Sequence, residues 1–295
     1  MIVILGAFGK TGRAAAARLE SAGKYRVRRV TRDGARASAA PEVVRARLSD
    51  DVELGSALRG AQAVYALLPD DLGARAFRAE RRAMAEAMTR AIAREAVPRV
   101  VLLSSAAAAL GEGAKNGLGA DLAYLERLVQ SAAAQVTILR ASYFQDNVTQ
   151  VLASAAQDGL FPSFFASRDA PIPTIAAKDV GQFAAEILLE PAPSESQVVD
   201  LLGPSYSSTE MAAVAGQVLG RALSVVDVPL TQQEQMFRSW MSPEAAQAMI
   251  ETFACLGSER ALPQSQRTLH GKTRLDQVLR AALARAPESA RQVQP

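Results

Sequence analysis

The feature that most constrains the fold is a glycine-rich turn at the start of the chain. The apolar residues Ile2–Leu5 run directly into Gly6, and two more glycines follow at intervals of three before an alanine-rich stretch. An apolar strand, a tight glycine turn and a helix, in this order, bring backbone N–H groups and a helix N-terminus to a dinucleotide pyrophosphate. Gly6 would permit the sharp turn, Gly9 would let the pyrophosphate approach, and Gly12 would let the helix pack closely on the strand.

Composition excludes several classes of protein. Nothing approaches the ~18 consecutive apolar residues of a membrane span, and the first residues enter a strand, so we expect a cytoplasmic protein. The net charge of +3 comes from basic residues spread along the chain, which does not favour a nucleic-acid partner. Cys255 and His270 are the single cysteine and histidine, so we expect no disulfide and no metal centre. Burial of Cys255 as an apolar side chain is favoured over a surface thiol.

Short apolar strands and helices alternate through the first half of the chain. The expected strands are 2–5, 26–30, 43–47, 62–68, 99–103 and 136–139, and the expected helices are 11–22, 52–58, 74–95 and 119–133. Near-continuous apolar strands that alternate with helices are typical of a parallel sheet buried on both faces. The sequence therefore predicts an α/β protein with a Rossmann-type, doubly wound parallel sheet over residues 1–158.

The alternation loosens after Tyr143. Residues 160–173 are interpreted as an irregular apolar segment, and His270 is placed in a polar loop. Helices are expected at 177–189, 208–219 and 231–257, with strands at 198–201 and 224–228. We expect residues 159–287 to form a smaller C-terminal α/β substrate lobe interwoven with the core, and residues 288–295 to be a disordered tail.

Motifs further along the chain resemble one family. They are Arg32 after the second strand, Leu103–Ser105 after the fifth, and the segments Thr137–Asn147, Asp179–Gly181 and Asp200–Pro204. With the Gly-x-x-Gly-x-x-Gly spacing of the first turn, they resemble the NmrA-like group of atypical short-chain dehydrogenases/reductases. Relatives in that group include NAD(P)H quinone oxidoreductases, triphenylmethane-dye reductases and non-catalytic redox sensors. The resemblance implies an NAD(P)-binding oxidoreductase.

The residue after the second strand indicates which nucleotide binds. An NAD site places an acidic residue there for the ribose 2′-hydroxyl, whereas this chain has Thr31 followed by Arg32. A guanidinium suits the doubly charged 2′-phosphate, which favours NADPH, with NADH as the alternative. Lys10 and Arg36 are candidates to assist, and Asp33 could still hold a ribose hydroxyl.

Other cofactor contacts carry over from the family by position. Asp50 would flank the adenine, although it could equally cap the helix that follows. Residues after the fourth strand would line the ribose and pyrophosphate, and the two serines after the fifth would lie near the nicotinamide, because ligands collect at the carboxyl ends of parallel strands. The expected cofactor-binding residues are Gly6, Phe8, Gly9, Lys10, Thr11, Gly12, Arg32, Asp50, Leu67, Leu68, Pro69, Ser104, Ser105 and Tyr143.

The usual catalytic pair is missing. Ordinary short-chain reductases use Tyr-x-x-x-Lys on the helix after the fifth strand, but Leu128 stands four positions after Tyr124. In one interpretation, hydride passes directly to an electron-poor aromatic acceptor, and either water or the hydroxyl of Tyr143 or Ser105 supplies the proton. Tyr143 could equally be a packing residue. In the other interpretation, the protein binds NADP(H) without turnover, as a redox sensor.

Aromatic side chains of the C-terminal part predict a cleft for a flat apolar ligand. The expected substrate-binding residues are Phe144, Phe161, Phe164, Phe165, Phe237, Trp240 and Met241, and Phe253 lies in the same segment. The helical spacing of Phe237, Trp240 and Met241 equally fits a buried core face. We expect a quinone-like or polycyclic aromatic ketone as substrate, and a monomer or homodimer.

Overall fold

A parallel sheet of eight strands forms the centre of the protein, in a computed structural model that describes residues 1–37, 40, 42–258 and 263–285. The strand order is β3-β2-β1-β4-β5-β6-β10-β13, and every neighbouring pair is parallel. Their bounds are β1 Ile2–Ile4, β2 Val27–Thr31, β3 Val43–Arg45, β4 Ala63–Ala66, β5 Arg99–Ser105, β6 Gln135–Ala141, β10 Gln197–Leu202 and β13 Arg267–His270. The order reverses between β1 and β4, which is where ligands bind in such sheets.

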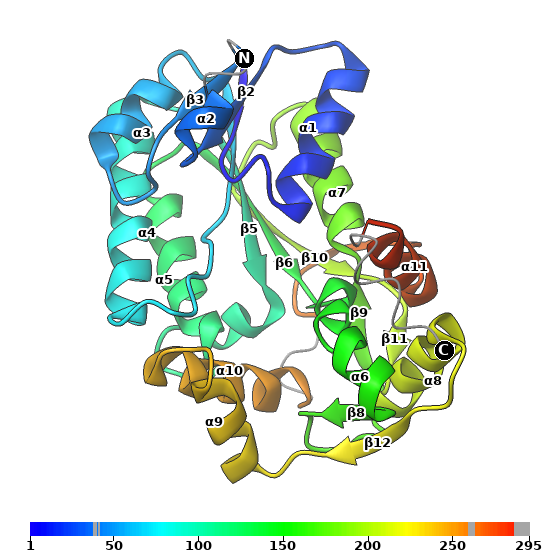
Figure 1. The fold of residues 1–295 in the computed structure, drawn as a ribbon. Helices are drawn as coiled ribbons and strands as arrows, with labels where there is room; N and C mark the ends of the chain where they lie inside the picture. The colour runs from blue at the N-terminus through cyan, green and yellow to red at the C-terminus, as the bar shows by residue number, and fades with distance from the viewer. Residues whose placement is uncertain (38–39, 41, 259–262, 286–295) are drawn as a thin grey trace.

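Helices cover both faces of this sheet (Figure 1). On one face lie α1 Lys10–Ala22 and α7 Ala177–Leu189; on the other lie α3 Asp51–Leu58, α4 Phe77–Arg94 and α5 Leu118–Gln130, and the short α2 Gly34–Ala37 follows β2. Each face has its own apolar core, because the strands are apolar on both sides. At Gly181 a Cβ atom would stand 2.2 Å from the carbonyl oxygen of Thr11, so this glycine lets α7 lie against α1. The prediction of a doubly wound α/β fold is confirmed.

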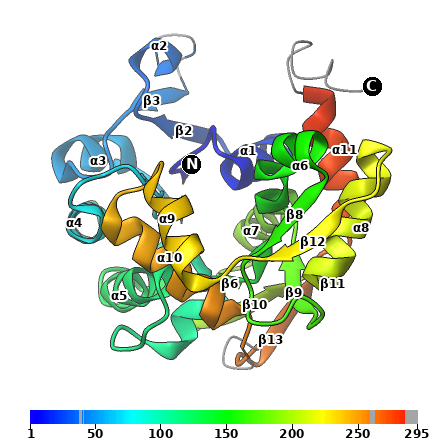
Figure 2. The same ribbon diagram turned by 60° about the horizontal axis from the view of Figure 1, so that its bottom comes forward.

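A smaller lobe lies beyond the carboxyl ends of the strands, and α9–α10 bridges from it to α4 and α5 (Figure 2). Three short strands form one sheet, β7 Tyr143–Phe144, β9 Ile172–Ile175 and β11 Ser205–Tyr206, and β8 Leu160–Ser163 pairs with β12 Ser224–Asp227. The helical elements are η1 Ala106–Leu110, η2 Gln145–Gln150, α6 Leu152–Asp158, α8 Ser208–Leu219, α9 Leu230–Arg238, α10 Pro243–Leu256 and α11 Leu275–Arg285.

Three expectations for the C-terminal part were wrong. The segment 160–173 is not irregular throughout, because it begins with β8 and ends within β9, and only residues 164–171 lie outside a strand. The expected helix 231–257 is two helices, because Ser242 caps α10 and Pro243 cannot continue a helix from the preceding residues. His270 ends β13, which pairs with β10, so it does not lie in a loop. The tail 288–295 lies outside the described residues, and the boundary at 158/159 stays a prediction.

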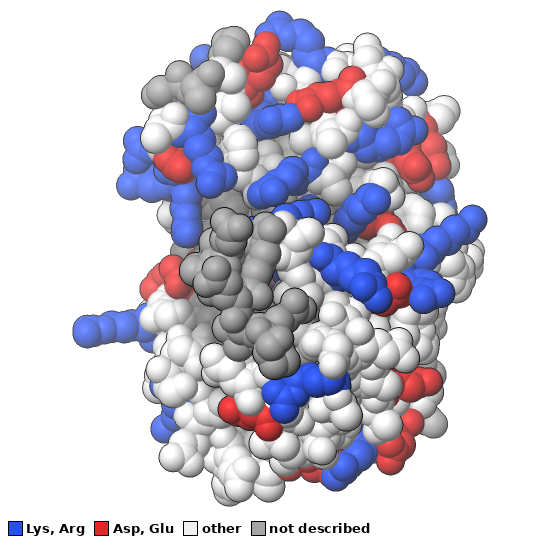
Figure 3. All heavy atoms as spheres, turned by 45° about the vertical axis from the view of Figure 1, so that its right-hand side comes forward, with Lys and Arg blue, Asp and Glu red and all other residues white. Residues whose placement is uncertain are grey.

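The surface of the protein carries charges of both signs, and its single cysteine lies inside. Lys and Arg side chains alternate with Asp and Glu over the face in Figure 3. Cys255 is buried. Within the described ranges, no helix has the length and apolar character needed to cross a membrane, and no three His, Cys, Asp or Glu side chains are grouped closely enough to hold a metal ion.

Candidate functional site

The glycine turn between β1 and α1 leaves a helix N-terminus open. Gly6 has a φ of 65°, and its carbonyl accepts a hydrogen bond of 2.9 Å from the N–H of Gly9. A Cβ atom at Gly12 would lie 2.3 Å from that same carbonyl oxygen, so no larger residue fits the present turn. Gly9 occupies the N-cap position of α1, where no side chain caps the helix. The first amides of α1 are therefore available to an anion such as a pyrophosphate.

The side chains around the turn have different partners. Arg36 pairs with Asp33 at 3.1 Å and lies 5.1 Å above the ring of Phe8. The residue expected to assist at the 2′-phosphate and the residue expected to hold a ribose hydroxyl are thus paired with each other. Lys10 points the other way, donating to the carbonyl of Asp146 in η2. Arg32 is exposed, and no described residue forms a hydrogen bond or ion pair with it. This leaves its guanidinium available to a phosphate.

Asp50 is a helix cap in this structure. Its Oδ1 accepts hydrogen bonds of 3.0 Å from the backbone N–H groups of Val52 and Glu53 at the start of α3, and its Oδ2 accepts from Arg47 at 2.8 Å. The N–H of Glu53 makes the largest contribution to lowering the pKa of Asp50. The capping alternative is what the geometry shows, and contact with an adenine stays a prediction.

The residues after β4 face in two directions. Leu67 lies against the glycine turn, since a Cβ atom at Gly6 would be 3.1 Å from the leucine Cδ2. Leu68 packs into the core beneath α3 and α4, on the opposite side, which is the direction expected for alternate residues of an extended chain. Leu67 is therefore the better placed of the two to line a bound nucleotide. The carbonyl of Pro69 accepts a hydrogen bond from Arg81.

The two serines at the end of β5 are both engaged. The hydroxyl of Ser104 donates to Glu126 at 2.5 Å, and Glu126 pairs with Arg140 of β6 at 2.7 Å, in a largely buried network. The Oγ of Ser105 accepts from the N–H of Ala107 and caps η1. Ser104 therefore links β5 to α5. The hydroxyl proton of Ser105, in contrast, has no assigned acceptor among the described residues.

The tyrosine on α5 lies away from this edge. The Tyr124 hydroxyl donates to Glu86 of α4 at 2.8 Å, and that hydrogen bond raises the pKa of Tyr124. The guanidinium groups of Arg82 and Arg127 lie 5.0 and 5.1 Å from the Tyr124 ring. Leu128 stands four positions after Tyr124, and the Tyr124 hydroxyl is bound to Glu86 of α4.

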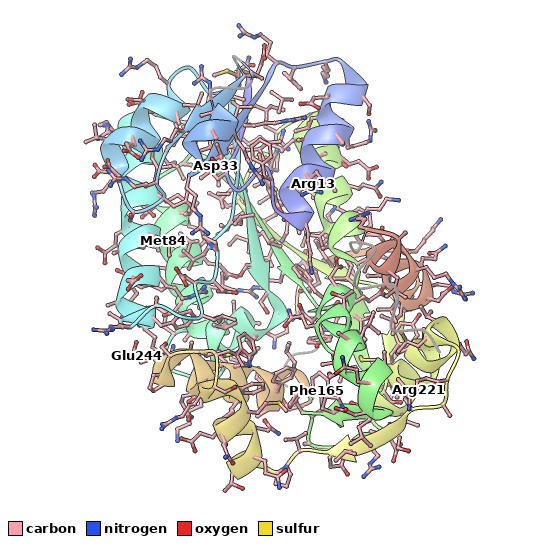
Figure 4. The ribbon with its side chains drawn as sticks, viewed as in Figure 1. Arg13, Asp33, Met84, Phe165, Arg221 and Glu244 are labelled. Atoms are coloured by element: carbon pink, nitrogen blue, oxygen red, sulfur yellow. The ribbon has the colours of Figure 1, made fainter. Side chains whose placement is uncertain are left out.

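Tyr143 connects the carboxyl edge to the lobe. It follows β6 by two residues, and its ring meets Phe165 edge-on at 5.4 Å and Phe253 at 6.2 Å. Burial raises the pKa of the Tyr143 hydroxyl above its usual value, so this hydroxyl keeps its proton throughout the neutral range. Figure 4 shows Phe165 in the lobe, beyond the ends of β5 and β6.

Aromatic rings gather around Tyr143, and we call this group the aromatic cluster. Its members are Tyr143, Phe164, Phe165, Phe237 and Phe253, with neighbouring centroids 5.1–6.2 Å apart. Trp240 extends it at 6.5 Å from Phe237 and is 52% exposed, so it forms a rim. Four of the expected substrate residues, Phe164, Phe165, Phe237 and Trp240, are thus brought together, and Met241 packs in the same core.

Two expected substrate residues lie elsewhere. Phe161 is buried in the neighbouring core between β8 and α8, and Phe144 packs toward the core beneath α1 and α7. Phe77, at the start of α4, was not predicted, although it is buried in the same apolar core as Phe237 and Phe253 of the aromatic cluster. Its position just after the β4 loop was the available signal. A separate cavity of ≈ 320 Å³ opens at the opposite, amino edge of the sheet beside Lys24 and Arg99, remote from these groups.

The chain belongs to the NmrA-like family, whose model matches residues 1–284. This confirms the resemblance inferred from the sequence. A curated relative from Streptomyces griseus subsp. griseus, (4-alkanoyl-5-oxo-2,5-dihydrofuran-3-yl)methyl phosphate reductase, is 26% identical over 260 residues, covering 85% of this chain and 86% of the relative.

Solved structures share the fold. The NADPH-dependent quinone oxidoreductase of Escherichia coli in complex with NADPH matches with a TM-score of 0.78 and 20% identity, over 95% of this chain and 98% of that one. The triphenylmethane reductase of Citrobacter sp. in complex with NADP(H) matches with a TM-score of 0.75 and 16% identity, over 95% and 99%. The expectation of an NAD(P)-dependent oxidoreductase with NADPH as cofactor agrees with this family and these relatives.

Proposed function

We propose that the protein is an NADPH-preferring reductase that transfers hydride directly to a quinone-like or polycyclic aromatic ketone. The observation that carries this proposal is the position of Tyr143, which lies at the carboxyl edge of the sheet and also in the aromatic cluster. A ligand at the nicotinamide end of a bound dinucleotide would therefore meet aromatic rings. Flat conjugated acceptors fit such a surface, because they stack on aromatic side chains.

The residues present fit the cofactor. The uncapped start of α1 and the glycine turn would hold the pyrophosphate, and the unpaired Arg32 would hold the 2′-phosphate. When bound, NADPH supplies the hydride. The aromatic cluster would orient the acceptor and exclude water from it. A quinone that takes up one hydride and one proton becomes a hydroquinone, and the Tyr143 hydroxyl, whose pKa is raised by burial, would supply that proton.

The relatives' names support an acceptor of this class. A quinone is a conjugated cyclic diketone and a triphenylmethane carries three aromatic rings, whereas the Streptomyces reductase is named for a phosphate ester. In this chain, three lobe arginines are already engaged: Arg168 with Asp227, Arg238 with Glu234, and Arg221 with the carbonyl of Ala156. Figure 4 shows Arg221 beside α8. These contacts favour an uncharged aromatic acceptor over a phosphorylated one.

A steady-state assay tests the proposal. Oxidation of NADPH is followed with a panel of benzoquinones, naphthoquinones and anthraquinones, and hydroquinone formation is measured in parallel. We expect turnover with at least one aromatic quinone and a lower kcat/KM with NADH. Tight binding of NADPH without oxidation by any member of the panel would contradict a reductase.

That contrary result would favour the second candidate, a redox sensor that binds NADP(H) without turnover. One observation supports it. Tyr124 is bound to Glu86 on the helical face, and Leu128 stands where ordinary reductases have lysine, so the usual proton-transfer machinery is absent. A sensor would change its thermal stability on binding NADPH or NADP⁺ and would consume neither.

Removing the Tyr143 hydroxyl tests its role as proton donor. We expect Tyr143→Phe to lower kcat for a quinone about 100-fold, at the lower end for loss of a general acid, while KM for NADPH stays unchanged. The ring remains in the aromatic cluster, so the melting temperature should change little. Tyr124→Phe is the matched control and should leave kcat unaltered. If both variants turn over like the wild type, Tyr143 only packs.

A further inference from the structure

A fully buried arginine reaches the loop that follows β4. Arg81 of α4 is 1% exposed. Its Nη1 donates to the carbonyl of Pro69 at 3.3 Å and also pairs with the carboxylate of Asp70, while its Nε donates to Asp121 of α5 at 3.2 Å. The guanidinium lies 5.4 Å from the ring of Phe77. Burial of a charge is costly unless it is paired and hydrogen-bonded, and here both Nη1 and Nε of Arg81 have carboxylate partners.

The loop it holds lies at the place where a nucleotide would bind. β4 neighbours β1, the sheet order reverses between them, and Leu67 touches the glycine turn. Arg81 therefore fixes one end of the segment 67–70, and the glycine turn contacts the other. Displacement of Pro69 would move Leu67 relative to Gly6, because only two peptide units separate the two loop residues.

Arg78 and Arg82, which also lie on α4, have other partners. Arg78 donates to the carbonyl of Gly117 and pairs with Glu251 of α10, which links α4 to the helix that carries Phe253. Arg82 lies over the ring of Tyr124. Both also approach Asp121, at 3.6 and 3.7 Å. Among these three arginines, Arg81 is the one that donates to the backbone of the β4 loop.

We propose that Arg81 is a positioning residue that holds the loop 67–70 in the shape required for NADPH binding. The inference rests on the proposed cofactor. Arg81 does not touch the cofactor itself; it acts through the Pro69 carbonyl and the Asp70 carboxylate, with Asp121 anchoring it from behind. Arginine is required because its planar fork spans both sides at once, whereas the single ammonium of a lysine satisfies one.

The test is Arg81→Lys, compared with wild type by NADPH fluorescence titration, steady-state kinetics and thermal unfolding. We expect Kd and KM for NADPH to rise about tenfold, because a displaced loop loses about the binding free energy of one hydrogen bond. We expect kcat at saturating NADPH and KM for the quinone to stay within about twofold, because Arg81 contacts neither reactant.

Arg99→Lys is the matched control. Arg99 is also a buried arginine, and it donates to the carbonyls of Ile187 and Glu190 at 2.6 and 2.8 Å, but at the amino edge of the sheet. We expect this variant to lower the melting temperature and leave Kd for NADPH unchanged. An unchanged Kd in Arg81→Lys, or an equal rise in both variants, would overturn the proposal.

A second variant covers the case in which Arg81→Lys does not fold. Asp70→Asn removes the charge partner on the half-exposed loop side and leaves Arg81 and Asp121 in place. We expect a smaller rise in Kd for NADPH, about threefold, and an unchanged Kd would again contradict the positioning role. A wild-type protein that binds no NADPH would instead refute the proposed function itself.

Discussion

Alanine at position 12 is expected to abolish tight NADPH binding while the protein remains folded. The added Cβ atom would lie 2.3 Å from the Gly6 carbonyl oxygen and 2.9 Å from the Ala7 Cα atom, both of which are backbone atoms. The turn must open to make room, and its amides and the start of α1 then no longer point at one phosphate position. We expect Kd for NADPH to rise by at least about 100-fold, equivalent to two factors of ten in binding.

Circular dichroism separates this effect from unfolding. Overpacking costs about 1–3 kcal/mol, so Gly12→Ala should lower the melting temperature by only a few degrees. Gly113→Ala is the control, since nothing lies within 4 Å of its Cβ position and its φ is not positive. Equal affinity of Gly12→Ala and wild type for NADPH would mean that the turn does not hold the pyrophosphate.

Replacing Arg32 with alanine is expected to remove the preference for NADPH. The guanidinium is exposed and unpaired among the described residues, so its loss breaks no hydrogen bond or ion pair with any of them, and we expect folding to be unaffected. A hydrogen-bonded charge pair with the 2′-phosphate contributes about 1.5–3 kcal/mol, which predicts a 10- to 100-fold rise in Kd for NADPH. Kd for NADH, which lacks that phosphate, should hardly change.

Arg36→Ala is the comparison for this experiment. Arg36 is already paired with Asp33 and stacked on Phe8, so we expect a smaller loss of NADPH affinity than with Arg32→Ala. Titration of both variants with NADPH and with NADH gives four Kd values, each of which is compared with that of the wild type. If Arg32→Ala weakens NADPH and NADH equally, this residue does not recognise the 2′-phosphate.

The central fold was predictable because its signals are local. The strands β1, β4, β5 and β6 each contain a short, largely apolar run, and the glycine turn connects β1 to α1 between Ile4 and Lys10. α7 and α8 begin and end where their sequence patterns predict. By contrast, β13 is a four-residue edge strand with a mixed sequence, and its pairing with β10 depends on a partner more than sixty residues away.

The sequence predicted that the candidate site lies at the carboxyl edge of the sheet, but it did not predict the contacts that the side chains make there. Position alone places Leu67 and Tyr143 at the ends of strands, and the structure has them there. The hydrogen bond from the Ser104 hydroxyl to Glu126 could not be predicted from the sequence, because the acceptor lies on a different element, α5. Arg81 stands among polar residues of a long helix, so its sequence is typical of a solvated face. Its burial is decided by Asp121, forty residues further on.

The pairing of β10 with β13 has a consequence for how the specificity of such proteins can change. The chain leaves the sheet after Leu202 and rejoins it at Arg267, on the strand directly beside the one it left. The described residues between these strands, including α9 and α10 with their aromatic residues, belong to an insertion whose two ends lie on adjacent strands of the sheet and which pairs with the rest of the lobe through β11 and β12. Such a segment can be exchanged for one of another length or shape without altering the register of β1, β4 and the glycine turn. New acceptors can thus be accommodated while the edge predicted to bind the nucleotide stays the same.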